Sequence, residues 1–148
     1  MIKSIQLSSV VVLTLAVGCD TGPKSARGFS LPDGNVESGQ AVFLDFKCNA
    51  CHSISGADLP VVEEPELNVA LGGEVARIKT YGELVTSIIN PSHKLARGYS
   101  SADDQTEGTS NMKNYNDVMT VSELIDLVAF LQSHYELRPY EPTYYPPY

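Results

Sequence analysis

The chain has 148 residues, enough for one domain of ordinary size. Eighteen acidic residues outnumber ten basic residues, and the formal net charge at pH 7 is −8. Because nucleic acid is itself densely negative and is bound through Lys and Arg, this balance argues against a nucleic-acid-binding protein.

Residues 1–18 have the features of an export signal. Lys3 supplies a short charged region, and residues 10–17 form an apolar run interrupted only by Thr14. The run is too short to span a bilayer, which takes about 20 apolar residues. Small residues follow it, as at a signal-peptide cleavage site. We therefore predict a signal peptide over residues 1–18, with an uncleaved amphipathic helix as the alternative.

The end of this signal, Leu-Ala-Val-Gly-Cys at residues 15–19, resembles a bacterial lipobox. In a lipobox the cysteine becomes the first residue of the mature protein and carries acyl chains, which together make a stable anchor. The resemblance implies that Cys19 is lipidated and that the protein is anchored at the periplasmic side of a bacterial membrane. Asp20, directly after this cysteine, resembles the signal that keeps such lipoproteins at the inner membrane, so the inner membrane is favoured over the outer. Residues 19–34 are rich in Gly, Pro and Ser and are predicted to form a flexible tether.

Residues 35–138 are predicted to form an all-α domain of three to four short helices separated by long loops. The first helix is expected over residues 36–47. Its apolar or small residues recur at helical spacing, at Val36, Gly39, Phe43 and Phe46. A glycine inside a helix costs about 1 kcal/mol relative to alanine, so Gly39 indicates that another helix approaches closely.

A pair of cysteines follows this helix, in the run Cys48-Asn49-Ala50-Cys51-His52. The C-x-x-C-H spacing is the attachment signal of c-type haem. Two thiols on one helical turn can add to the two vinyl groups of one porphyrin, and the adjacent histidine can then reach the iron. Zinc and a thiol redox pair are the alternatives. A zinc ribbon needs a second cysteine pair, and a thioredoxin-like pair needs a βαβ context, so haem is favoured.

Two T-x-x-E capping boxes, at Thr80 and Thr120, predict two further helices. Their apolar faces are Leu84, Val85, Ile88 and Ile89 in the first helix and Leu124, Leu127, Val128 and Leu131 in the second. The helix that begins after Thr80 is expected to stop at Pro91, and the helix that begins after Thr120 is expected to end near residues 134–136. Residues 53–73 and 92–115 are expected to be long loops. Residues 139–148 form a Pro/Tyr-rich tail suited to polyproline II.

The domain resembles the small monohaem class I cytochromes c. The matching features are the C-x-x-C-H run, Gly39 with Phe43, and the D-L-V-A-F-L run at residues 126–131. The resemblance implies a cytochrome c fold in which short helices and long loops wrap around one covalent haem, with the first and last helices crossing at the glycine. It also implies that Pro65, in a P-x-L motif, accepts a hydrogen bond from the ligand histidine through its carbonyl group.

The resemblance makes His52 one axial ligand of the iron. The other axial ligand of an electron-transfer cytochrome c is usually methionine. Met119 already has a structural role, since it precedes the N-cap Thr120 and can form a hydrophobic staple with Leu124. Met112 lies in a polar loop with no helix face to pack on, and we predict it as the sixth ligand.

Other side chains are weaker candidates for the haem site. Tyr81, Arg97 and Tyr99 could hydrogen-bond the haem propionates, with ordinary surface positions as the alternative. His93 and His134 remain outside candidates for the sixth ligand.

A haem with both axial sites filled carries one electron and leaves no open site for a substrate. The sequence therefore predicts a one-electron carrier, not an enzyme, that exchanges electrons with redox partner proteins. Two alternatives remain. One is a haem subunit of a periplasmic dehydrogenase or terminal-oxidase complex, and the other is a haem-based gas sensor with an open or labile sixth site.

Overall fold

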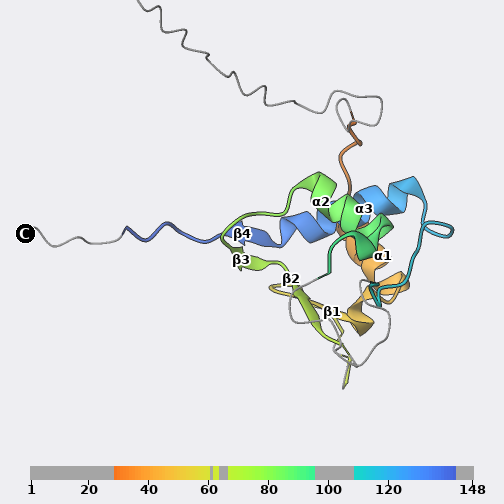
Figure 1. Cartoon of the computed structure of the whole chain (residues 1–148), viewed down its shortest axis with the longest axis horizontal. Helices are drawn as coiled ribbons and strands as arrows, with labels where there is room; N and C mark the ends of the chain where they lie inside the picture. Colours follow the sequence, from red (N-terminus) through yellow and green to blue (C-terminus); the bar gives the residue numbers. More distant parts are fainter. Residues whose placement is uncertain (1–28, 61, 64–66, 96–108, 143–148) are drawn as a thin grey trace, which may run out of the picture. The chain divides into compact units, whose positions relative to one another are not determined.

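The computed structural model describes residues 29–60, 62–63, 67–95 and 109–142 (Figure 1). All helices and strands of this part belong to one compact unit, which begins at Leu31. The predicted signal peptide and most of the predicted tether lie outside it. Within the described ranges, no helix combines the length and the hydropathy that a membrane span requires.

Three α-helices confirm the three predicted helical segments. In chain order the elements are α1 Val36–Asp45, the 3₁₀ turn η1 Cys48–Ala50, β1 His52–Ile54, β2 Val69–Leu71, β3 Gly73–Val75, α2 Tyr81–Ile89, the 3₁₀ turn η2 Pro91–His93, α3 Val121–Ser133 and β4 Tyr135–Leu137. The first helix ends at Asp45, two residues earlier than predicted, because Lys47 adopts the left-handed conformation with φ 56°.

The expectation of an all-α domain was incomplete, since the structure adds four short strands. They form two parallel pairs: β1 with β2, where His52 lies opposite Val69, and β3 with β4, where Gly73 lies opposite Tyr135. Each strand has three residues. Three residues are too few for a two-residue alternation to show in the sequence, which is why these strands were missed.

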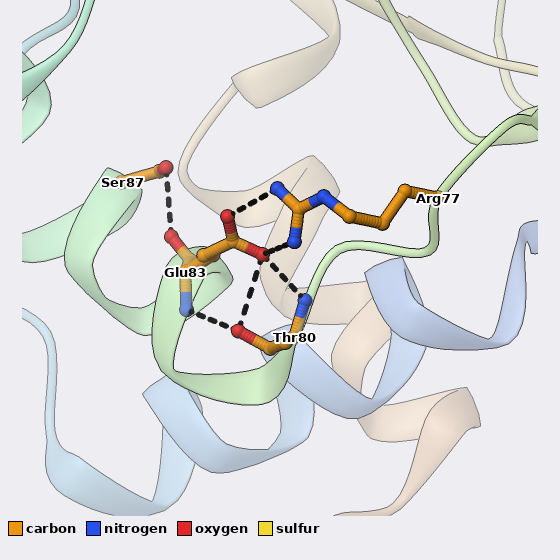
Figure 2. A network of polar contacts seen from close by, with 4 residues as sticks. All are labelled: Arg77, Thr80, Glu83 and Ser87. Carbon is orange, nitrogen blue, oxygen red and sulfur yellow. Dashed lines mark hydrogen bonds and ion pairs between the residues drawn. The ribbon is translucent and has the colours of Figure 1, made fainter. Parts of the chain in front are cut away.

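Both predicted capping boxes are confirmed. Thr80 Oγ1 accepts a hydrogen bond from the Glu83 backbone N–H at 3.2 Å, and the Glu83 carboxylate accepts one from the Thr80 N–H at 2.9 Å. Figure 2 shows that Arg77 adds a two-pronged ion pair to the same carboxylate, with N–O distances of 2.6 and 2.9 Å. The hydrogen bond from Arg77, followed by that from Thr80, lowers the pKa of Glu83 to about 2. Thr120 and Glu123 repeat the box at α3.

The close approach predicted at Gly39 is present where α1 packs on α3. A Cβ atom added to Gly39 would lie 2.6 Å from the Cβ of Phe130 and closer still to the backbone carbonyl oxygen of Asp126. Next to this contact, the rings of Phe43 and Phe130 lie 5.7 Å apart between centroids, inclined by 58°. The crossing is fastened at its edge by the Asn35 N–H, which donates to Asp126 Oδ1 at 2.8 Å.

The core joins the three helices to the segment that contains the cysteines. Its buried members are Val42, Phe43, Ile54, Leu84, Val85, Ile88, Leu127, Val128, Phe130 and Leu131. Ile54 comes from β1, and the half-buried Cys48 packs against the same cluster. The C-x-x-C-H run therefore lies directly against the helical core.

Candidate functional site

The chain turns sharply just before the first cysteine of the pair. Phe46 caps α1, and Lys47 then adopts the left-handed conformation, which costs a non-glycine residue roughly 1–2 kcal/mol. The next residues form the η1 turn, closed by the Cys51 N–H donating to the Cys48 carbonyl at 3.1 Å. We call residues 46–52 the attachment segment.

Both cysteines of the attachment segment are free thiols. Cys51 is exposed, whereas Cys48 is half-buried against the core, and this burial raises the pKa of Cys48 to about 11. Thiol redox sites need the opposite shift, because the thiolate is the reactive form. Cys48 is therefore unsuited as the nucleophile of a thiol redox site, and both sulfur atoms are available for covalent attachment of a prosthetic group.

His52 is held in the form that binds a metal. Burial lowers the pKa of this half-buried imidazole, which favours its neutral state. Its Nδ1 lies 3.2 Å from the Val69 carbonyl oxygen. Because a carbonyl can only accept, Nδ1 carries the proton and Nε2 is left with the lone pair for an iron.

The hydrogen bond from His52 to the Pro65 carbonyl, expected from the sequence, stays a prediction. Pro65 lies outside the described residues, and the carbonyl group at hydrogen-bonding distance belongs to Val69. Val69 reaches His52 because β1 and β2 pair in parallel, with the Val69 N–H donating to the Cys51 carbonyl at 2.8 Å. No pattern in the sequence indicates this pairing, so Val69 could not have been found from it.

A cavity of about 220 Å³ opens beside Cys51 and His52. Its other lining residues are Asn49, Ser53, Ile54, Ala57, Leu59, Pro60, Val62 and Asn68. Most of the residues that follow β1 in this lining are apolar. They give the side of His52 a surface suited to a large apolar ring system.

Tyr81, the first residue of α2, carries a buried polar atom. Its hydroxyl is shielded from solvent and has no hydrogen-bond partner among the described residues, and desolvation raises the pKa of Tyr81. A buried hydroxyl without a partner costs roughly 1–3 kcal/mol, so its position fits a polar group contributed by a bound cofactor. The other two candidates for this role, Arg97 and Tyr99, lie outside the described residues.

Met112 is partly shielded from solvent. It is half-buried, although its neighbours Asn111 and Lys113 are exposed. Its N–H donates to Ser110 Oγ at 3.2 Å, and the Ser110 N–H donates to Ser92 Oγ at 3.1 Å. We call residues 109–119, drawn in teal in Figure 1, the Met112 segment. These bonds fix its beginning to η2.

The competing ligand candidates have local structural roles. Met119 and Leu124 are both partly buried against the core, as expected for a hydrophobic staple. His93 is exposed and directs Nδ1 to the Asn90 carbonyl at 2.8 Å. His134 caps α3, with Nδ1 2.8 Å from the carbonyl of Phe130.

Tyr115 connects the Met112 segment to the attachment segment, a link that the sequence did not indicate. Its hydroxyl donates to the Phe46 carbonyl at 3.1 Å, and the two rings meet edge to face at 5.3 Å. Burial, and then the proximity of Cys48 and Cys51, raises the pKa of Tyr115. The segment that carries Met112 therefore packs beside the cysteine pair.

Together these residues fit a covalently attached haem. Cys48 and Cys51 would hold it through two thioether bonds, His52 would bind its iron through Nε2, and the Tyr81 hydroxyl would meet one of its polar groups. Apolar residues beside His52, of which Ile54 is buried, supply part of the surface on which such a group would pack.

Comparison with known families agrees with this geometry. The family model "Cytochrome c" matches residues 36–134, which run from the start of α1 to the C-cap of α3. No protein of curated function and no solved structure is significantly similar to the chain. Because the family match covers more than half of the chain, the chain belongs to the cytochrome c family, as a class I monohaem member with a covalently bound c-type haem.

Proposed function

We propose that this protein is a one-electron carrier whose haem iron is bound by His52 on one side and Met112 on the other. Cytochromes c carry electrons between redox partner proteins, which fixes the general function. The observation that carries the finer proposal is the half-buried Met112, in a segment that Tyr115 fastens to the attachment segment.

The bound haem supplies one-electron chemistry at its iron, and the chain supplies ligands, orientation and a low dielectric. His52 contributes a neutral imidazole whose Nδ1 proton is held by the Val69 carbonyl, an arrangement that fixes the ring and raises the basicity of Nε2. Met112 contributes a thioether, which favours the reduced state and raises the reduction potential. With His52 and Met112 both bound to it, the iron would have no position open to a substrate.

Substituting the two methionines separately tests this ligation. Met112→Ala should abolish the weak charge-transfer band of methionine-ligated ferric haem, lower the reduction potential and allow carbon monoxide to bind the reduced protein. Met119→Ala is the matched control. It should keep the band and lower the free energy of unfolding by about 0.5–3 kcal/mol, because it removes only core packing.

The same experiment can contradict the proposal in distinct ways. Loss of the band in Met119→Ala with its retention in Met112→Ala would reverse the assignment. Absence of the band from the unaltered protein would make a histidine the ligand, with His93 and His134 as the candidates. Binding of carbon monoxide to the unaltered reduced protein at neutral pH would instead support the gas-sensor alternative.

We further propose that the protein is a lipoprotein, anchored through Cys19 at the periplasmic side of a bacterial inner membrane. The support is the lipobox-like run at residues 15–19. It comes from the sequence alone, because Cys19 lies outside the described residues. An intact-mass measurement of the mature protein tests this, and a mass without added lipid would disprove it. Pull-down from solubilised membranes separates a free carrier from a subunit that copurifies with a dehydrogenase or oxidase.

A further inference from the structure

The hydroxyl of Tyr115 makes a hydrogen bond between two segments that are far apart in the sequence. It donates to the carbonyl of Phe46, the C-cap residue of α1. Carbonyls at the end of a helix have no partner inside the helix, and a side chain from another segment can satisfy them. Here that side chain comes from a residue three positions after Met112, and the carbonyl lies two positions before Cys48.

Among the described residues, three hydrogen bonds join the Met112 segment to other parts of the chain, and only one of them reaches the attachment segment. The Ser110 N–H donates to Ser92 Oγ at 3.1 Å, and Asn116 Nδ2 donates to the Ile89 carbonyl at 2.9 Å. These two bonds fasten the segment to η2 and to the end of α2. The Tyr115 hydroxyl and ring alone, among the three, join the segment to the residues that precede the cysteine pair.

We propose that Tyr115 is the positioning residue of the sixth ligand: its hydrogen bond to the Phe46 carbonyl holds the Met112 segment against the attachment segment and thereby keeps the Met112 thioether at the iron. The proposal rests on the ligation described under Proposed function. Met112 and Cys48 lie on different stretches of chain, so the separation between them depends on a link such as this one. Without the link, the segment remains fastened to α2 and η2 but can move away from α1.

The consequence is measurable as competition for the sixth position. An external ligand such as imidazole enters only when Met112 leaves, so its apparent affinity reports the fraction of molecules in which the segment is released. A typical hydrogen bond changes such an equilibrium by about 2- to 12-fold. Tyr115→Phe removes the hydroxyl and keeps the ring that packs on Phe46.

The experiment is an imidazole titration of the full-length ferric holoprotein, followed by visible absorption. Tyr115→Phe should keep the methionine charge-transfer band without imidazole and raise the apparent imidazole affinity by about 2- to 12-fold. Tyr115→Leu, which also removes the ring contact, should raise it further. Tyr135→Phe is the matched control, because Tyr135 is a partly buried tyrosine packed on the core in β4, which pairs with β3, and it should leave the affinity unchanged.

Unchanged imidazole affinity in Tyr115→Phe would overturn the proposal, even if the variant unfolds at a lower denaturant concentration, because a purely structural role moves only the unfolding midpoint. Met112→Ala separates this failure from that of the proposed ligation. If Met112→Ala keeps the charge-transfer band, Met112 is not the ligand and both proposals fail. If Met112→Ala loses the band while Tyr115→Phe leaves the affinity unchanged, only the positioning role is wrong.

Discussion

The helical frame of α1, α2 and α3 and the iron-binding side are held together in different ways. In the frame, side chains interdigitate, and Phe43, Val128 and Phe130 are at most 1% exposed. On the iron-binding side, His52 and Met112 are only half-buried, and single hydrogen bonds such as that between Tyr115 and Phe46 position the chain. Packing errors should therefore destabilise the frame as a whole, whereas lost hydrogen bonds should alter ligation or local stability.

The largest effect is expected at the crossing of α1 and α3. In Gly39→Ala the new methyl group would overlap the backbone of Asp126, which cannot move aside as a flexible side chain can. Overpacking typically costs about 1–3 kcal/mol, and contact with a backbone carbonyl places this variant at the upper end of that range or above it. Denaturant unfolding of the holoprotein measures the loss.

Gly82→Ala is the matched control for this prediction. Gly82 lies in α2, and a Cβ atom there would meet nothing within 4 Å. The substitution should raise the free energy of unfolding by about 0.5–1 kcal/mol, because alanine loses less backbone entropy in a helix. Equal effects of the two alanines would show that Gly39 is not a contact point between helices.

A smaller effect, whose sign tells whether the haem reaches this residue, is expected at Tyr81, the first residue of α2. If the buried hydroxyl hydrogen-bonds a carboxylate of the haem, Tyr81→Phe should lower the stability of the holoprotein by roughly 1.5 kcal/mol. If the hydroxyl has no partner, the same variant should become more stable, since an unsatisfied polar group is removed. Tyr140→Phe, at a residue 88% exposed, serves as the control without effect.

The smallest effect is expected at the start of α2, and it depends on pH. Because the pKa of Glu83 is lowered to about 2 from an ordinary value of 4.5, its stabilising contribution is complete above pH 4.5 and is lost as the pH falls toward 2. Glu83→Gln keeps the capping box but cannot ionise, so its stability should fall less steeply between these pH values. An unchanged slope would mean that the exposed ion pair with Arg77 contributes nothing measurable.

The frame was largely predictable from the sequence because its signals are local. The capping boxes at Thr80 and Thr120 and the spacing of apolar residues gave three helices whose ends agree with the structure to within about two residues. Gly39 indicated the contact between α1 and α3 only because glycine is costly inside a helix. The C-x-x-C-H run likewise identified the attachment segment by a spacing that its chemistry demands.

The iron-binding side was less predictable because its contacts join distant segments through generic groups. The Val69 carbonyl beside His52 and the Phe46 carbonyl that receives Tyr115 are backbone atoms, which every residue possesses. A sequence cannot show which carbonyl lies opposite a given side chain unless the pairing of segments is already known. For the same reason the three-residue strands were missed, since their pairing depends on the position of the whole chain.

The parallel pairing of β3 with β4 affects the order in which parts of the domain can fold during synthesis. Residues 73–75 pair with residues 135–137, and α1 packs on α3, so the elements that enclose the early part of the domain are among the last to be synthesised. Synthesis proceeds from the N-terminus, and contacts between distant segments form late in folding. Cys48 and Cys51 therefore exist for a time in a chain in which neither the pairing of β3 with β4 nor the packing of α1 on α3 has formed.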